Sequence, residues 1–167
     1  MTASRHRLWF LLLALVVLAA DQVSKWGVAS ALASGETQPI IPGFFNLIHL
    51  HNRGAAFGLF SEMHSPLGTI LLIAFSVAVL TVVFALFWQR PSGRATATAL
   101  AFLLGGALGN LLDRVRTGYV VDFLDFQLAG YHWPAFNLAD SAIVVGAAVI
   151  FWQLLRGKSK ALAQREA

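Results

Sequence analysis

Four long apolar runs dominate the pattern of hydrophobic and polar positions along this chain. Each run has about 20 residues, which is the length that spans a bilayer as an α-helix. We predict transmembrane helices over residues 8–32, 67–88, 95–112 and 137–155. The composition supports this prediction, since 57% of the residues are hydrophobic and 12% are charged, whereas a soluble domain is about 25% charged. The predicted fold class is an all-α membrane protein, with residues 1–167 forming a single integral membrane domain.

The basic residues predict the orientation of these helices. Most of them cluster just outside the apolar runs, at Arg5, Arg7, Arg90, Arg94, Arg156, Lys158, Lys160 and Arg165. Because cytoplasmic loops carry an excess of Lys and Arg, we expect both termini and the 89–94 loop to lie in the cytoplasm. Every Asp and Glu except Glu166 falls on the other side or inside a helix. Membrane orientation therefore accounts for the net charge of +4, and we expect no nucleic-acid partner.

The first apolar run also has the pattern of a signal peptide. Arg5-His6-Arg7 precedes apolar residues 8–20, and Ala31-Leu32-Ala33 is similar to a cleavage site. However, Asp21 and Lys25 interrupt the run before that site. We therefore favour a retained transmembrane helix.

Two connecting segments, 33–66 and 113–136, fall on the predicted extracytoplasmic side. Phe44–His51 and Tyr119–Phe126 within them are rich in β-forming residues with partial alternation. This pattern predicts short strands. We expect a small extracytoplasmic β-sheet lying on the membrane surface.

Asp122 and Asp140 are the two residues that most need a functional explanation. Both lie in strongly apolar surroundings, and an acidic residue at membrane depth costs about 2.5–3.5 kcal/mol on insertion scales. Burial of Asp122 between Val121 and Phe123 favours its protonated form, whereas the start of the fourth helix favours an ionised Asp140. Two such carboxyl groups, sharing a proton across a helix bundle, activate water in aspartic proteases. Asp125 is a third candidate acid with less apolar near neighbours.

Further polar residues flank these aspartates. Asp21 and Lys25 are spaced i, i+4 and share a helix face. They form either an ion pair near the membrane surface, where the helix ends, or a pair that positions the site or contacts substrate. Asn52 carries both donors and an acceptor, which suits it to hold a peptide backbone, and Gly54 suggests a tight turn.

The end of the third apolar run combines small and polar residues. Gly105 and Gly109 form a small-xxx-small face that lets another helix approach closely. Packing does not explain Asn110, Asp113 and Arg114, which are neighbours on the helix surface near the outer interface.

A metal site is a weaker interpretation. His49 and His51 share a strand face and, with Asp122 and Asp140, offer zinc ligands. The chain has no cysteine and no His-Glu-x-x-His pattern. We therefore expect no metal and no other cofactor.

Five motifs together resemble the lipoprotein signal peptidase family, signal peptidase II. They occur in the family's order, as Asp21-Gln-x-x-Lys25, Asn52-x-Gly-Ala-Ala-Phe57, Gly105-x-x-x-Gly-Asn-x-x-Asp-Arg114, Val121-Asp-Phe123 and Phe136-Asn-x-Ala-Asp140. Each motif alone is weak, but the five in order are specific and cover the chain from the first helix to the fourth.

The resemblance implies an aspartic endopeptidase of the bacterial plasma membrane, with its active site near the extracytoplasmic face. The implied substrate is a prolipoprotein that carries diacylglycerol on its lipobox cysteine, cleaved just before that cysteine. Asp122 and Asp140 match the family's catalytic pair. Four positions match polar residues around the site, implied to contact substrate: Asn52, Asn110, Arg114 and Asn137. Supporting positions are Asp21, Lys25, Gly54 and Asp113. We expect a monomer in contact with bilayer lipids.

A small proton- or cation-coupled transporter is the alternative function, with Asp21, Asp113, Asp122 and Asp140 as the ion path. Against this alternative, the polar residues gather at one membrane face. The middle of the second apolar run, 70–87, holds only two polar residues, Ser76 and Thr81.

Overall fold

The computed structural model describes residues 3–54, 66–89 and 93–166 of the chain. Within these residues, four helices are long and apolar enough to cross a membrane. The helices are α1 (Ala3–Ala31), α2 (Pro66–Trp88), α3 (Arg94–Thr117) and α4 (Leu138–Glu166). The strands are β1 (Thr37–Ile41), β2 (Phe45–Asn52), β3 (Val120–Leu128) and β4 (Tyr131–His132). The prediction of four apolar helices with a small sheet is confirmed.

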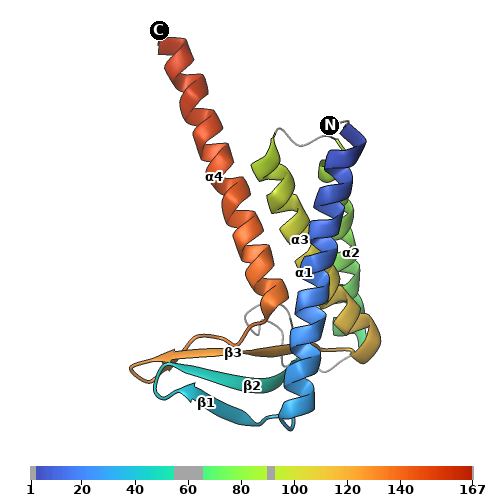
Figure 1. The fold of residues 1–167 in the computed structure, drawn as a ribbon, viewed down its shortest axis with the longest axis vertical. Helices are drawn as coiled ribbons and strands as arrows, with labels where there is room; N and C mark the ends of the chain where they lie inside the picture. The colour runs from blue at the N-terminus through green and yellow to red at the C-terminus, as the bar shows by residue number, and fades with distance from the viewer. Residues whose placement is uncertain (1–2, 55–65, 90–92, 167) are drawn as a thin grey trace.

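The helices form a bundle with the sheet across one end (Figure 1). The two chain termini lie at the opposite end of the bundle from the sheet. α3 packs against α1, α2 and α4, so it is the central helix. A core cluster of apolar side chains joins α1, α2 and α3, and it includes Ala14, Leu80, Phe87 and Leu104.

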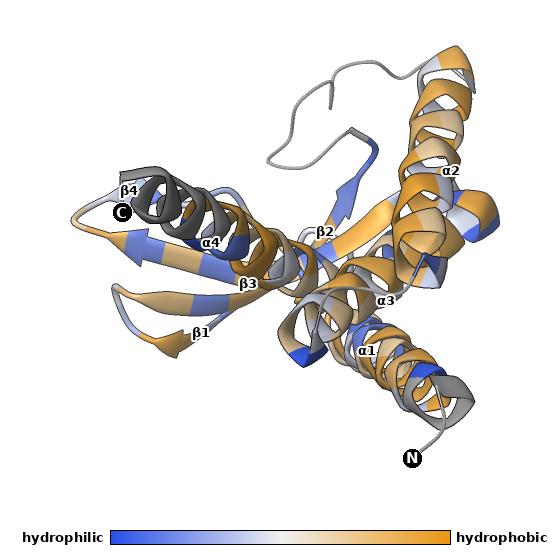
Figure 2. Ribbon diagram, turned by 90° about the horizontal axis from the view of Figure 1, so that it is seen from above, coloured by the Kyte–Doolittle hydropathy of each residue, from blue (hydrophilic) through white to orange (hydrophobic). Residues whose placement is uncertain are grey.

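Apolar side chains also cover much of the outer surface of the bundle. α2 is coloured hydrophobic along most of its length in Figure 2. Ile70, Phe75 and Val82 are 59–69% exposed on this helix. A surface of this kind is stable against lipid tails and unfavourable in water. The helices therefore present their outward faces to the bilayer.

The predicted helix boundaries were wrong at several ends. Among the helix ends that lie away from the chain termini, the largest error is at α3, which continues to Thr117 instead of ending at residue 112. Gly118 ends the helix in the left-handed conformation, with φ of 79°, and its N–H donates to Arg114 O at 3.0 Å. A glycine in this conformation is a common helix terminator. Asp113 and Arg114 consequently lie on a helix rather than in a loop.

Close packing of α3 follows from its glycines, as the small-xxx-small pattern predicted. A Cβ atom on Gly105 would lie 2.5 Å from Ala14 O on α1. A Cβ on Gly109 would lie 2.5 Å from Asp21 Oδ2, also on α1. Only glycine permits these two approaches, so α1 and α3 meet at main-chain distance.

The sheet is antiparallel, in the order β1-β2-β3-β4. The two predicted strand regions correspond to β2 and β3. Leu50 pairs with Asp122 and Asn46 pairs with Asp125, with a register shift between Leu47 and Leu50. This register brings the end of β2, at Asn52, beside the part of β3 that carries Asp122.

Candidate active site

Asp122 lies on β3 and is only 1% exposed. Two side-chain amides donate to its carboxyl group. Asn52 Nδ2 lies 2.8 Å from Asp122 Oδ2, and Asn137 Nδ2 lies 2.7 Å from Asp122 Oδ1. Burial, together with the nearby charge of Asp140, raises the pKa of Asp122 to about 7. Asp122 can therefore hold or release a proton near neutral pH.

Asp140 lies in the first turn of α4, where Asn137 is the N-cap residue. The Asp140 backbone N–H donates to Asn137 Oδ1 at 2.9 Å, which is the usual capping contact. Asn110 on α3 donates from Nδ2 to Asp140 Oδ1 at 2.8 Å. The carboxyl group is thus fixed both by its own helix and by α3.

The amides that hold the aspartates cannot flip freely, because backbone groups fix their orientation. Asn137 Oδ1 accepts the Asp140 N–H, so its Nδ2 must face Asp122. Asn52 Oδ1 accepts the Gly54 N–H at 2.8 Å, so its Nδ2 must also face Asp122. Asn137 is 0% exposed, and it bonds to the Asp122 carboxyl group through its NH₂ and to the Asp140 backbone N–H through its oxygen.

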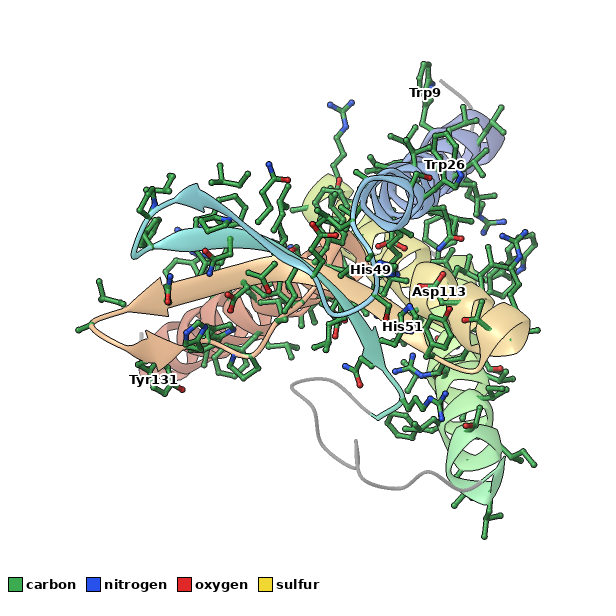
Figure 3. The ribbon with its side chains drawn as sticks, turned by 90° about the horizontal axis from the view of Figure 1, so that it is seen from below. Trp9, Trp26, His49, His51, Asp113 and Tyr131 are labelled. Atoms are coloured by element: carbon green, nitrogen blue, oxygen red, sulfur yellow. The ribbon has the colours of Figure 1, made fainter. Side chains whose placement is uncertain are left out.

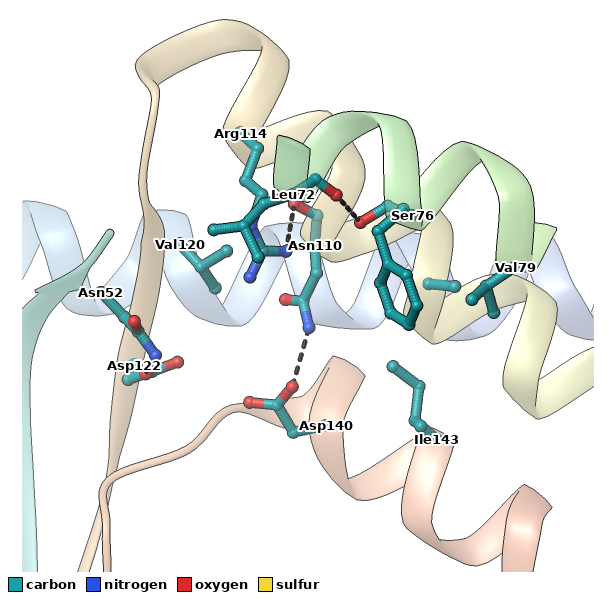
Figure 4. A pocket seen from close by; sticks show the side chains of 12 residues that line it. Asn52, Leu72, Ser76, Val79, Asn110, Arg114, Val120, Asp122, Asp140 and Ile143 are labelled. Atoms are coloured by element: carbon teal, nitrogen blue, oxygen red, sulfur yellow. Dashed lines mark hydrogen bonds between the residues drawn. The ribbon is translucent and has the colours of Figure 1, made fainter. Parts of the chain in front are cut away.

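The two aspartates line one cavity of about 200 Å³ (Figure 4). Its other polar lining residues are Asn52, Ser76, Asn110 and Arg114. Its apolar lining residues are Leu72, Phe75, Val79, Ala107, Val120 and Ile143. One cavity thus combines two carboxyl groups with apolar side chains from α2 and α4. Among these, Phe75 is also exposed on the outer surface of the bundle.

Arg114 connects this cavity to the segment that follows β2. Its Nη2 donates to Gly54 O at 3.0 Å, and its Nη1 lies 3.3 Å from Asn110 O. Gly54 therefore bonds through its N–H to Asn52 and through its carbonyl to Arg114. Ala55, Ala56 and Phe57, which complete the Asn52 motif, lie outside the described residues.

Lys25 is the centre of a buried ionic network beneath the cavity. Its Nζ lies 2.8 Å from Asp21 Oδ2, 2.7 Å from Asp113 Oδ2 and 2.9 Å from Asn110 Oδ1. Asp21 also accepts the Ala139 N–H at 2.9 Å, so it binds the first turn of α4. The two residues form the ion pair that one interpretation predicted, but the helix does not end there. Asp21 and Lys25 are 0% and 4% exposed, and α1 continues to Ala31.

One polar residue of this network had no role assigned from the sequence. Gln22 Nε2 donates to Asp113 Oδ1 at 2.8 Å and lies 3.4 Å from Gly109 O. The available signal was its place inside the Asp21-Gln-x-x-Lys25 motif. The apolar wall of the cavity, including Leu72 and Phe75, has no such signal, because any lipid-facing helix carries residues of this kind.

Asp125 does not join the cavity. It lies three residues from Asp122 on the same strand, so the two side chains point to opposite faces. Asn46 Nδ2 donates to Asp125 Oδ2 at 2.7 Å, and His132 Nδ1 lies 3.1 Å from Asp125 Oδ1.

The suggested zinc set does not assemble either. Within the described parts of the chain, no group of three or more His, Cys, Asp or Glu side chains is placed to hold a metal ion. His49 and His51 contact each other and the end of α1 instead.

Comparison with known proteins gives one consistent result. The Signal peptidase (SPase) II family matches residues 13–156. The lipoprotein signal peptidase of Moorella thermoacetica is 47% identical over 147 residues, which cover 87% of this chain and 92% of that protein. The lipoprotein signal peptidase of Desulforapulum autotrophicum is 44% identical over 149 residues, covering 88% and 91%.

A solved structure agrees with the sequence comparisons. A bacterial membrane enzyme determined by the in meso method at 2.3 Å resolution superposes with a TM-score of 0.81 at 34% identity, covering 90% of each chain. None of these similarities supports a transporter. The chain therefore belongs to the signal peptidase II family of membrane aspartic peptidases, which is the family that its motifs resemble.

Proposed function

We propose that Asp122 and Asp140 are the catalytic pair with which this chain removes signal peptides from prolipoproteins. The observation that carries the proposal is their shared cavity, in which fixed amides orient both carboxyl groups. Asn52 and Asn137, held by backbone N–H groups, orient Asp122. Asn110, held by Lys25, orients Asp140. Preorganised groups of this kind lower the cost of reaching the transition state.

The two environments favour different roles in peptide hydrolysis. Asp122, with its pKa raised to about 7, carries the proton and acts as the general acid. Asp140 lies at the positive end of the α4 dipole and acts as the general base. Asp140 takes a proton from water as the water oxygen attacks the scissile carbonyl, while Asp122 protonates the carbonyl oxygen. The tetrahedral intermediate then collapses: the C–N bond breaks as the proton on Asp140 passes to the leaving nitrogen, and a hydroxyl group of the intermediate returns its proton to Asp122.

The shape of the site suits a substrate that arrives within the bilayer. Phe75, on the cavity wall, is 69% exposed on the outer surface of α2. An apolar wall that is continuous with the lipid-facing surface can take a diacylglyceryl chain together with the end of a transmembrane signal peptide. Cleavage just before the lipidated cysteine then requires unwound backbone at the carboxyl pair, where polar groups replace the lost helical hydrogen bonds.

The asparagines divide into two roles under this proposal. Asn137 and Asn110 are 0% and 7% exposed, and their amide groups already bond to protein. They position the carboxyl groups. Asn52 also holds Asp122. Because Asn52 and Arg114 are only partly buried and line the cavity, these two are placed to contact substrate backbone or lipid as well.

We propose that the sheet and the cavity face the extracytoplasmic side and that both termini are cytoplasmic. The basic flanking residues support this orientation through the positive-inside rule, and both termini lie at the end away from the sheet (Figure 1). The chain has no cysteine, so a single Cys at Gly93 or at Gln38 gives a clean accessibility test. Labelling of Gly93→Cys from outside, or of Gln38→Cys from the cytoplasm, would contradict the orientation.

We also propose that the enzyme acts as a monomer. Both carboxyl groups, and every group that we find holding them, belong to one chain. Activity per chain should therefore be independent of protein concentration in detergent.

The central experiment measures cleavage of a diacylglyceryl-modified prolipoprotein by the purified protein in detergent. Asp122→Asn and Asp140→Asn should each lower turnover by about 10³-fold or more, and the double variant should lose little beyond that, because the pair acts as a unit. Asp125→Asn is the matched control and should keep most activity. Near-normal turnover in either single variant would disprove the assignment.

Metal chelation provides an independent check. Because two carboxyl groups supply the acid and the base, cleavage should survive EDTA. Loss of cleavage in EDTA with recovery on adding Zn²⁺ would replace the carboxyl mechanism with a metal mechanism.

A further inference from the structure

His49 and His51 form a pair outside the catalytic cavity. They are two residues apart on β2, which places both side chains on one face of the strand. Their Nε2 atoms are 3.1 Å apart, and His49 Nδ1 lies 2.9 Å from the carbonyl oxygen of Leu32, just after α1. Figure 3 shows both rings beside the end of this helix. The pair does not belong to the aspartate site.

The hydrogen bonds fix which nitrogens carry protons. A carbonyl oxygen only accepts, so His49 carries its proton on Nδ1 and has a lone pair on Nε2. In the neutral pair, His51 therefore donates its Nε2–H to His49 Nε2. The neutral imidazole is the form that binds metals.

The two rings have the geometry of ligands to one metal ion. Zinc–imidazole bonds of about 2.0–2.1 Å, drawn to two nitrogens 3.1 Å apart, subtend an angle of about 95–102°. That angle is close to the tetrahedral value of about 109°. In such an arrangement, the ring centroids are about 4.8 Å apart, and the observed separation is 4.8 Å.

The surroundings of the two rings also match those of metal-binding histidines. Such residues commonly donate their second ring N–H to a backbone carbonyl, as His49 does to Leu32. His51 stacks on Tyr119 with ring centroids 3.8 Å apart, which fixes the plane of its ring. Ser34 Oγ lies 3.5 Å from His51 Nδ1 and can accept a hydrogen bond when this nitrogen carries the proton.

We propose that His49 and His51 chelate a divalent transition-metal ion of the zinc or copper class, at a site separate from the aspartate pair. The ion takes the place of the proton now between the rings. That proton moves to His51 Nδ1 and faces Ser34, so the tautomer changes without a change in charge. Water fills the remaining coordination positions, because His51 is partly exposed. Binding joins β2 more firmly to the end of α1 and stabilises the fold by mass action.

Calorimetric titration of the tag-free, full-length protein with Zn²⁺ in detergent is the first test. We expect about one ion per chain at this site, and a shift of the unfolding midpoint to higher temperature with Zn²⁺. His51→Gln and His49→Gln should each weaken binding by at least about tenfold. His132→Gln is the matched control from the same sheet and should leave binding unchanged. Wild-type affinity in His51→Gln, or equal losses in all three variants, would overturn the proposal.

A spectroscopic test does not depend on how the variants fold. Cu²⁺ binds imidazole sites more tightly than Zn²⁺, and its electron paramagnetic resonance spectrum should show coupling to two imidazole nitrogens in the wild-type protein. His51→Gln should reduce this to one nitrogen. A spectrum with no coupled nitrogen, or one that His51→Gln leaves unchanged, would show that the pair is only a hydrogen bond. Failure here leaves the aspartate mechanism untouched, since cleavage in EDTA tests that mechanism separately.

Discussion

Replacing Asp122 with Asn should change how the stability of this protein depends on pH. The raised pKa of Asp122 means that the folded state holds a proton that the unfolded state, with a pKa near 3.8, releases. The folded protein binds more protons between these two values, so the wild-type protein loses stability as the pH rises through this window. Asn at this position has no proton to release. The variant therefore lacks this loss.

The size of the effect follows from the two pKa values. A pKa raised from 3.8 to about 7 corresponds to a total of about 4 kcal/mol of lost stability at high pH. At pH 5 roughly a third of this has already been lost, because the unfolded group is then mostly ionised. Between pH 5 and pH 8 the Asn variant should therefore gain about 3 kcal/mol relative to the wild type.

The hydrogen bonds at Asp122 add a contribution that does not depend on pH. Asn52 and Asn137 both donate to the carboxyl group and cannot flip, since their oxygens bind backbone N–H groups. The NH₂ of an Asn at position 122 would face one of these donors. A buried donor without a partner costs about 1–3 kcal/mol. This cost lowers the stability of the variant by the same amount at every pH, so it does not change how that stability depends on pH.

Thermal unfolding in detergent, followed by tryptophan fluorescence from pH 5 to pH 8, measures the difference between the variant and the wild type. Titrating groups other than Asp140, which is coupled to Asp122, occur in both proteins and largely cancel in this difference. Ser76→Ala is the control, since Ser76 lines the same cavity but does not titrate. A difference for Asp122→Asn that stays constant across this range would refute the raised pKa, and with it the argument that Asp122 is the general acid.

Three further substitutions test the polar network that supports the site. Gly109→Ala places a Cβ 2.5 Å from Asp21 Oδ2 and should cost about 1–3 kcal/mol, measured as a lower unfolding temperature. Gly27→Ala, where a Cβ meets nothing within 4 Å, is its control and should not destabilise the protein. Lys25→Met leaves the buried Asp21 and the partly buried Asp113 without their cation and should cost about 3–5 kcal/mol; an unchanged unfolding temperature would show that the network is dispensable. Asn137→Ala removes the helix cap, which costs about 0.5–2 kcal/mol. It should also lower kcat at least tenfold with little change in KM, because Asn137 has no exposed surface for substrate, and a rise in KM alone would indicate substrate binding.

The helices and the main strands could be predicted from the sequence, because membrane length and β-propensity are local properties. The end of α3 could not be predicted in the same way. Asp113 and Arg114 end the apolar run and suggest a boundary there, but a helix continues for as long as its polar side chains find partners. Lys25 and Gln22 bind Asp113, and Gly54 binds Arg114. These contacts between distant segments accompany the continuation of the helix past residue 112, and Gly118 then ends it.

The aspartate pair could be proposed from the sequence because buried carboxyl groups are rare and costly in a membrane. The roles of the surrounding asparagines were harder to predict. An asparagine near a protease site is equally suited to hold substrate or to hold the catalytic groups. Only the structure shows that the Asn137 side chain donates to Asp122 and accepts from the backbone N–H of Asp140. Its position as the cap of α4 was the available signal, because a capping oxygen binds an N–H of the first turn and leaves the NH₂ of the same amide to donate to another group.

The ionic network explains why the site lies at the junction of three helices. Lys25 on α1 brings together Asp21 on its own helix with Asp113 and Asn110 on α3. Asn110 in turn donates a hydrogen bond to Asp140 on α4. Each buried charge in this chain of contacts has an opposite charge or an amide beside it, which offsets the cost of burial in a medium that supplies no water. Because the same side chains join the helices and orient Asp140, a substitution that loosens the bundle at Lys25 should also displace the Asp140 carboxyl group, which we propose activates water.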